Sequence, residues 1–206
     1  MKVYKLTDKS MQTCGKFQWK LGVPATASGE GNLCGPGWLH WYPDPLLAIL
    51  MNPMAEHHQV KSNNLRMFEA EAQGETRLDY GYRGGSTELV LVRELTGDEI
   101  PKPTDLQCAT FGVLCAKATN LYPGPWFRDW LSGEDRSAAS AQEVKAKCER
   151  IKCDWGRCAA AGVLRVAKGE HPHEHAWAAH YASFYAAKNQ YRPFDLAELA
   201  RQAISA

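Results

Sequence analysis

The sequence predicts an α+β protein in which a small β-rich N-terminal part is followed by a C-terminal helical bundle. Up to about residue 98, short segments of alternating apolar and polar residues are separated by glycine-rich turns, which is typical of β-strands. Beyond residue 104 the pattern becomes helical. We therefore expect a β-rich domain with one short helix over 1–98, a boundary segment over 97–103, and a helical bundle over 104–206.

Strands are predicted in four segments of the first half: 2–6, 17–22, 65–72 and 87–95. The segment TELVLVREL (87–95) is the strongest candidate because it is rich in β-branched residues and lies between the turns RGGS and TGD. Segment 24–37 has too many Gly, Ser and Pro residues for a regular element, so it is predicted to be a loop. Its glycines match neither the phosphate-binding loop nor the dinucleotide fingerprint.

The one helix expected in the first half spans 44–51, with Asp44 as its N-cap, Pro45 at its first position and Asn52-Pro53 as its stop. In the second half, a capping box formed by Thr104 and Gln107 begins a helix. The helices expected there run from 104 to about 120, over 126–131 with a stop at Gly133, from 137 to 168 with a stop at Gly169, from Pro172 to about Gln190, and over 195–204.

Composition narrows the classes of partner. The chain has 206 residues, a formal net charge of +1 and 45% hydrophobic residues, so it can bury a core but lacks the basic excess of most nucleic-acid-binding proteins. No apolar run approaches the ~20 residues of a membrane span. The first ten residues do not resemble a secretory signal, and seven cysteines form no regular disulfide framework. We expect a cytoplasmic protein with no membrane partner, and nucleic acid is disfavoured.

Three cysteines spaced five residues apart, Cys148, Cys153 and Cys158, cannot converge on a metal from one helix, because each is rotated about 140° from the last. Cys148 and Cys158 instead fall on an apolar stripe, whereas Cys153 lies off it. The stripe indicates a packing seam, which would serve equally inside one monomer or in a homodimer. Its members are Val144, Cys148, Ile151, Trp155, Cys158 and Gly162.

The segment GEHPHEHAWAAHYASFYAAK (169–188) contains four histidines. His173 and His180 share a helix face but lie about 10 Å apart along the axis, too far to ligate one ion. His171 and His175 share another face and would need a further ligand from a different helix. The sequence therefore predicts neither a metal site nor a cofactor. An aromatic stripe that continues the face of His180 is expected to lie in the core: Trp177, Tyr181, Phe184 and Tyr185.

One candidate site lies at the predicted turn from strand to helix, where aromatic rings, an imidazole and a carboxylate are close in sequence. Such groups line small-molecule pockets. The alternative is that Trp38 and Trp41 anchor the sheet to the bundle while His40 faces solvent. The members of this candidate site are Trp38, His40, Trp41, Tyr42 and Asp44.

Two further clusters are candidates for a ligand or partner surface. Asp79, Tyr80 and Arg83 lie in LDYGYRGGSTE (78–88) and would line the same cleft as the first cluster, unless they only form a hairpin loop. The third cluster comprises Glu134, Asp135 and Arg136. These charged residues either cap the helix that follows or recognise a partner.

The motif GWLHWYPDPLLAILMNP (37–53), combined with WLSGEDRS (130–137) before an Ala-rich helical tail, resembles a group of uncharacterised bacteriophage and prophage proteins. The similarity spans most of the chain. It implies a phage-type accessory protein with a β-rich front and a helical back, and it implies no reaction. The tail departs from the usual pattern because several expected alanines are Cys, Lys or Trp here.

The preferred hypothesis is a non-enzymatic factor that binds and modulates or inhibits a host protein, such as a CRISPR effector or another defence complex. A second hypothesis is an NAD-using enzyme similar to ADP-ribosyltransferases, with His40, Ser86, Thr87 and either Glu88 or Glu94 as its functional residues. A third is an accessory factor for nucleic-acid modification, with stacking aromatic rings in place of basic charge. The sequence leans away from catalysis without excluding it.

Overall fold

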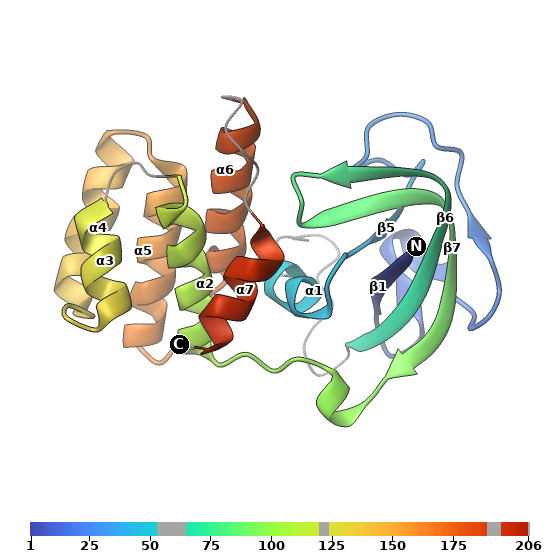
Figure 1. Ribbon diagram of the computed structural model, residues 1–206, viewed down its shortest axis with the longest axis horizontal. Helices are drawn as coiled ribbons and strands as arrows, with labels where there is room; N and C mark the ends of the chain where they lie inside the picture. The colour runs from blue at the N-terminus through green and yellow to red at the C-terminus, as the bar shows by residue number, and fades with distance from the viewer. Residues whose placement is uncertain (53–64, 120–123, 189–194, 206) are drawn as a thin grey trace. The chain divides into compact units, whose positions relative to one another are not determined.

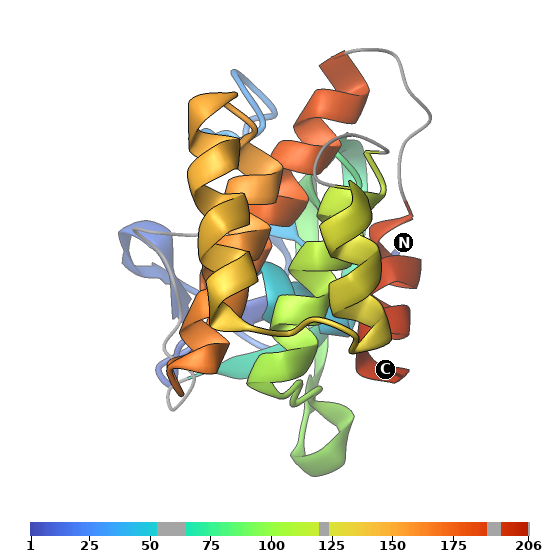
Figure 2. The same cartoon turned by 90° about the vertical axis from the view of Figure 1, so that its left-hand side faces the viewer.

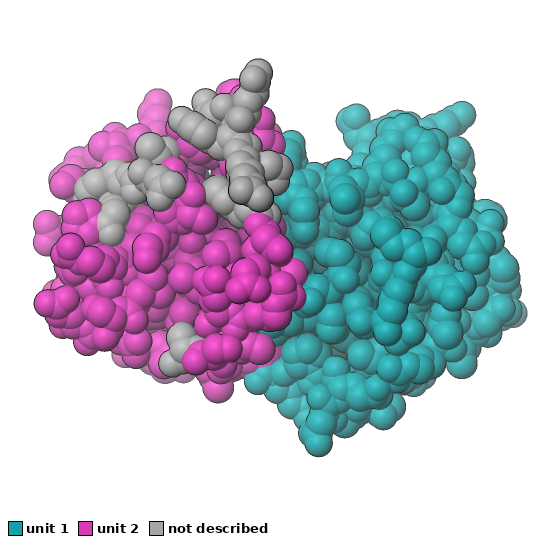
Figure 3. All heavy atoms as spheres, in the orientation of Figure 1, with its two compact units in different colours: residues 1–102 teal, residues 103–206 magenta. Residues whose placement is uncertain are grey.

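The computed structural model describes residues 1–52, 65–119, 124–188 and 195–205. The chain divides into two compact units, residues 1–102 and residues 103–206 (Figure 3). Antiparallel strands form most of the first unit, and α-helices form the second. The predicted α+β class, with a β-rich part before a helical part, is therefore confirmed.

The sheet of the first unit is antiparallel and centres on a long hairpin of β6 and β7 (Figure 1). The strand order is β1-β6-β7-β4, and β5 also pairs with β7, while β2 and β3 form a separate small sheet. The strands are β1 (Lys2–Thr7), β2 (Gln12–Thr13), β3 (Phe17–Gln18), β4 (Ala25–Thr26), β5 (Leu39–Trp41), β6 (Arg66–Asp79) and β7 (Arg83–Leu95), with 3₁₀ turns η1 (Cys14–Lys16) and η4 (Gly97–Glu99).

The strands predicted at 2–6, 65–72 and 87–95 are confirmed, and both strands of the hairpin extend well beyond the predicted ends. The extension was missed because the far end of β6 is polar and exposed, so no apolar alternation marks it. The predicted strand at 17–22 is wrong beyond Gln18. The predicted loop 24–37 is interrupted by the two-residue strand β4, which pairs with β7.

Helix α1 (Pro45–Met51) begins and ends as predicted. The Asp44 carboxylate accepts hydrogen bonds from the amides of Leu46 and Leu47 at 2.8 and 3.2 Å, which satisfies two amides of the first turn. The core of this unit includes buried side chains from β1, β5, β6 and β7: Val3, Trp41, Phe68, Leu89 and Leu91.

The second unit contains six α-helices among its described residues (Figure 2). They are α2 (Asp105–Lys117), α3 (Gly124–Ser132), α4 (Ala138–Arg150), α5 (Asp154–Ala167), α6 (Glu174–Lys188) and α7 (Leu196–Ser205). The predicted capping box is present, with Thr104 Oγ1 and the Gln107 side chain each accepting the other residue's amide. Gly133 and Gly169 have φ of +82° and +72°, which fits their predicted role as helix stops. The predicted helix end near Asn120 and the end near Gln190 lie outside the described residues.

The single helix predicted from 137 to 168 is wrong, because α4 ends at Arg150 and α5 begins at Asp154. Lys152 turns the chain with φ of +56°, a conformation that usually requires glycine. At this turn the side chain of Ile151 is 52% exposed, whereas Cys153 lies in the core with 5% exposure. The predicted stripe is therefore broken, and the assignment of Cys153 to a position off the packing face is also wrong.

Most residues of the apolar stripe that was considered as a homodimer interface are buried inside the second unit. Val144, Cys148 and Cys158 are buried within one hydrophobic cluster, and Gly162 is also buried. These residues are covered by neighbouring helices of the same chain, so they offer no surface to a second copy. Cys148 and Cys158 are core residues, as predicted.

Helix α6 begins at Glu174 rather than Pro172, and it packs against α2 and α5 through small residues. The prediction that its aromatic stripe lies in the core is wrong for Phe184, which is 42% exposed. Trp177, Tyr181 and Tyr185 are half-buried, and Trp177 and Tyr181 pack against the core cluster. The buried residues of α6 are His175, Ala176, Ala178, Ala179, Ala182, Ser183 and Ala186.

Two glycines show how closely α6 approaches its neighbours. A Cβ added to Gly112 of α2 would lie 2.9 Å from the Cα of His175, which is backbone and cannot swing aside. A Cβ added to Gly162 of α5 would meet Pro172 at 3.7 Å, an ordinary contact. The contact between α2 and α6 therefore admits no side chain at position 112, and bulky aromatic residues of α6 must point elsewhere.

The substitution Gly112→Ala is expected to lower the free energy of unfolding by about 1–3 kcal/mol, because the added methyl forces α2 and α6 apart. Gly162→Ala is the matched control, and its unfolding free energy should stay level or rise by up to about 1 kcal/mol from the better helix propensity of alanine. Urea denaturation followed by circular dichroism measures both. Equal stability of the two variants would contradict the close approach at Gly112.

Candidate functional site

Two of the predicted clusters meet at the closed end of the β6–β7 hairpin. The pairing of β5 with β7 sets His40 opposite Gly85 and Trp41 opposite Gly84. The hairpin pairs Asp79 with Arg83. The segments 38–44 and 78–88 are thus brought together by strand register.

Arg83 joins this end of the hairpin to the loop before β5. Its Nε donates to the Asp79 carboxylate at 2.8 Å, and its Nη2 donates to the Cys34 sulfur at 2.6 Å. The Tyr82 hydroxyl donates to the same carboxylate at 3.2 Å. We call Cys34, Asp79, Tyr82 and Arg83 the Arg83 latch, because these contacts hold the loop to the hairpin.

The charges and hydrogen bonds of the Arg83 latch stabilise the protonated form of the Arg83 guanidinium. Burial opposes the charge of Arg83, but the phenol of Tyr82 and the hydrogen-bonded carboxylate of Asp79 outweigh it, so the pKa of Arg83 lies above its usual value. Burial raises the pKa of the Tyr82 phenol well above its usual value. Arg83 is therefore a cation and the Tyr82 phenol is neutral across the physiological pH range.

His40 is held neutral next to the latch. Its Nε2 lies 2.5 Å from the carbonyl oxygen of Leu33, and since a carbonyl only accepts, Nε2 carries the proton. Burial lowers the pKa of His40, and the positive charges of Lys5 and Arg83 lower it further. Lys5 donates to the backbone carbonyl of His40 at 2.6 Å. His40 neither faces solvent freely nor offers its Nε2 as a base.

Trp38 and Trp41 are only 3% and 1% exposed, so their assignment to a ligand or partner surface is wrong. The Trp41 ring packs on Gly84, where a Cβ would lie 2.3 Å from the ring. The Trp38 ring lies under the guanidinium of Arg77, at 4.3 Å. Both indoles pack within the first unit.

The other two residues of the first cluster also have structural surroundings. Burial raises the pKa of the Tyr42 phenol, and the Asp44 carboxylate caps α1. Tyr80 of the second cluster is 39% exposed, and its ring stacks on that of Tyr82 at 6.5 Å. Tyr80 is therefore the most accessible aromatic ring at this end of the hairpin.

The third predicted cluster serves the turn between α3 and α4. The Asp135 carboxylate accepts from the amide of Ser137, the N-cap residue of α4. The Nε of Arg136 donates to the carbonyl of Trp130 at 3.1 Å, and its guanidinium covers the Trp130 ring. The side chain of Glu134 is exposed, and its backbone amide donates to the Ser132 hydroxyl at 3.4 Å. The capping alternative fits this corner better than a recognition surface.

Of the two carboxylates considered for an NAD-using enzyme, Glu94 lies apart from His40, whereas Glu88 lies on β7 three residues beyond the partner of His40. The Glu94 carboxylate pairs with Arg66 through two hydrogen bonds of 2.7 and 2.5 Å. It lies about 30 Å along β7 from Gly85, which faces His40. Ser86 is buried, and its hydroxyl donates to the carbonyl of Glu88 at 2.8 Å. His40 and Glu94 cannot act on one ligand of ordinary size.

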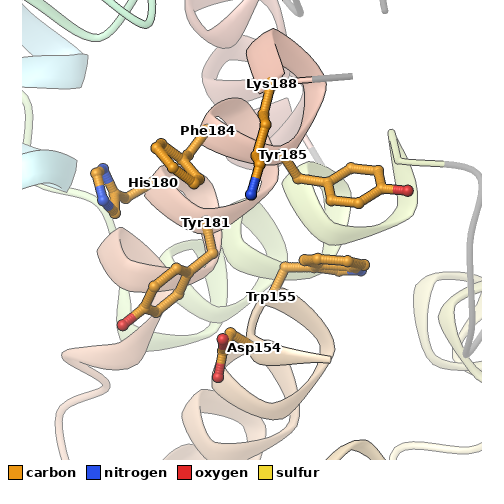
Figure 4. Close-up of a pocket in the computed structure, with 7 residues that line it drawn as sticks. All are labelled: Asp154, Trp155, His180, Tyr181, Phe184, Tyr185 and Lys188. Atoms are coloured by element: carbon orange, nitrogen blue, oxygen red, sulfur yellow. The ribbon is translucent and has the colours of Figure 1, made fainter. Parts of the chain in front are cut away.

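A pocket of about 370 Å³ lies between α5 and the C-terminal half of α6 (Figure 4). Sequence reasoning missed it, because it had placed these aromatic side chains in the core. We call it the aromatic groove, and its lining residues are Asp154, Trp155, His180, Tyr181, Phe184, Tyr185 and Lys188.

The aromatic groove has rings along its walls and opposite charges from its two helices. The rings of Trp155 and Tyr185 are 4.6 Å apart, and His180 stacks on Phe184 at 6.3 Å. Asp154 lies at the start of α5, whereas Lys188 extends from the last turn of α6 (Figure 4). Such a groove can hold an apolar side chain and pair with one charge of each sign beside it.

We also searched the described residues for a metal site and for a membrane-spanning helix. No group of three or more His, Cys, Asp and Glu side chains there is placed to hold a metal ion. His171 pairs with Asp105, and His175 is buried with its Nδ1 2.8 Å from the carbonyl of Pro172. No helix in the described ranges is long and apolar enough to span a membrane.

Comparison with known proteins identifies one family. Residues 1–102 match the model of a family described as a domain of unknown function (DUF7666). This range coincides with the first compact unit, so the Arg83 latch lies inside the match and the aromatic groove lies outside it. No curated protein and no solved structure matches the chain.

The Arg83–Asp79 pair is expected to stabilise the hairpin more than the exposed pair of Arg77 and Glu75, although both have N–O distances of 2.7–2.8 Å. Asp79 is 13% exposed, so Asp79→Ala leaves Arg83 poorly solvated and should lower the unfolding free energy by about 2–3 kcal/mol. Glu75 is 55% exposed, and Glu75→Ala should cost less than about 1 kcal/mol. Urea denaturation of both variants tests this, and a larger loss for Glu75→Ala would refute it.

Proposed function

We propose that the protein is a phage-type accessory factor that binds a protein of the bacterial host in the host cytoplasm, and that the aromatic groove is its contact surface. The phage and host parts rest on the sequence resemblance described above. The observation that carries the binding role is the row of accessible rings on α6.

Phe184 is not part of the core of the second unit, whereas Trp177 and Tyr181 of the same helix pack against the edge of that core. The face of α6 that packs against α2 and α5 consists of alanines with His175 and Ser183. Phe184 is 42% exposed. Exposing an apolar ring to water is unfavourable, and the packing of α6 does not require it. Grouped accessible aromatic rings on a globular protein mark binding surfaces, and Trp and Tyr dominate the binding energy of protein interfaces.

The charges of the groove favour a protein as the occupant. Lys188 is the one lysine or arginine among the groove's lining residues. Asp154 lies at the opposite end of the groove (Figure 4) and pairs with Arg157 at 3.3 Å. A nucleic acid would need several cations along its phosphate backbone. A polypeptide can supply an apolar side chain for the rings together with an acidic residue near Lys188.

Binding is favoured over catalysis by the state of the polar groups in the first unit. The latch pairs Arg83 with Asp79 and Cys34, and His40 is neutral with its Nε2–H donated to Leu33. A catalytic centre needs an acid, a base or a nucleophile aimed at open space. Defence complexes, such as CRISPR effectors, are the first host targets to test.

The test begins with capture of a stoichiometric partner from host lysate, followed by affinity measurement with purified components. Phe184→Ala should weaken binding at least tenfold, because it removes a ring at the centre of the contact. Ile204→Ala is the matched control: Ile204 is an apolar residue of α7 with 41% exposure, and its loss should change affinity less than twofold.

Circular dichroism must show that both variants are folded. Undiminished affinity of Phe184→Ala, or equal losses in the two variants, would rule out the groove as the contact surface. A purified protein that captures no partner from any plausible host would count against the binding function itself.

A further inference from the structure

The corner between α4 and α5 is a Schellman motif built without glycine. The amide of Cys153 donates to the carbonyl of Cys148 at 2.8 Å, and the amide of Lys152 donates to that of Glu149 at 3.3 Å. Lys152 has the left-handed conformation that the motif requires, with φ of +56°. This pattern of hydrogen bonds brings residues 148 and 153 side by side.

In such a motif the two residues that meet are usually a pair of apolar side chains. Here both are cysteines, and they are 0% and 5% exposed. Their thiols form a hydrogen bond with each other. Cys158 lies further along the chain, in α5, and is buried to a similar extent with 4% exposure. Its thiol therefore serves as a buried control for the reactivity of the pair.

We propose that Cys148 and Cys153 are a dithiol pair that closes to a reversible disulfide and thereby fixes the α4–α5 corner. The two residues are neighbours through both a backbone hydrogen bond of 2.8 Å and a hydrogen bond between their thiols. The oxidant is a low-molecular-weight disulfide such as oxidised glutathione.

The reaction proceeds by two exchanges. The Cys153 thiolate attacks one sulfur of oxidised glutathione, which forms a mixed disulfide and releases one glutathione thiolate. Cys148 then loses its proton to that thiolate and attacks the Cys153 sulfur, which releases the second glutathione. The two protein thiols are oxidised by two electrons in total, and one oxidised glutathione is reduced to two glutathione molecules.

The surroundings distinguish the attacking sulfur from its neighbours. The hydrogen bond from the Cys148 thiol lowers the pKa of Cys153, and the backbone amide of Gly156 adds to this effect. The same interaction, with burial, raises the pKa of Cys148 far above its usual value. Burial raises the pKa of Cys158 to about 11. Cys153 is therefore the first nucleophile, and Cys158 is a bystander.

The bond would also constrain the aromatic groove, because Asp154 and Trp155 directly follow Cys153 and form part of the groove's lining. Any effect on partner binding rests on the proposed function. Formation of the disulfide does not, so it can be tested on the protein alone and succeeds or fails separately.

The experiment equilibrates the full chain in glutathione buffers of increasing oxidised fraction, quenches with acid, alkylates the remaining thiols under denaturing conditions and measures mass. The bond should remove two alkylated sites. Trypsin should yield residues 148–150 linked to residues 153–157. The oxidised protein should unfold about 5 °C higher than the reduced protein.

Cys148→Ala and Cys153→Ala should each abolish the linked peptide and the thermal shift, whereas Cys158→Ala should retain both. A parallel sample is refolded from urea in the same buffers, so that all thiols are accessible to the oxidant. Full alkylation of Cys148 and Cys153 in both samples would overturn the proposal. A disulfide that instead joins either residue to another cysteine would overturn it as well.

Discussion

The close approach of α6 to α2 is the constraint on which the second unit depends. Gly112 leaves no room for even a methyl group against the backbone of His175, so α6 can bury only small side chains and one histidine on that side. Interiors are packed too densely for large rings to be inserted at such a contact. The rings of α6 lie away from the contact at Gly112, and those of His180, Tyr181, Phe184 and Tyr185 line the aromatic groove together with Trp155 of α5.

The hairpin end of the first unit and the aromatic groove of the second unit differ in how accessible their side chains are. In the first unit, Trp41 is buried against Gly84 and Arg83 is paired with Asp79 and Cys34, so these groups contribute to stability and are withheld from ligands. In the second unit, Phe184 remains accessible although the core is closed without it. The contact surface that we propose therefore lies outside the range that matches the family of unknown function.

Local rules identified much of the fold from sequence. Asp44 with Pro45, and Thr104 with Gln107, mark helix starts through contacts between near neighbours, and both predictions were confirmed. The α4–α5 break was missed because Lys152 occupies a position where sequence rules look for glycine. The groove was missed because helical periodicity finds an apolar face without showing which neighbour covers it. The contact of Gly112 with α6 depends on tertiary structure, so the sequence pattern alone does not show it.

Hydrogen–deuterium exchange on the purified complex of this protein with its captured partner tests the central claim most directly. Exchange protection is measured by peptide across the chain, with and without the partner. We predict new protection over the start of α5 and the second half of α6, and little change at the hairpin end around Asp79 and Arg83. Protection confined to the hairpin end, with the α6 peptides unchanged, would contradict the assignment of the aromatic groove as the contact surface.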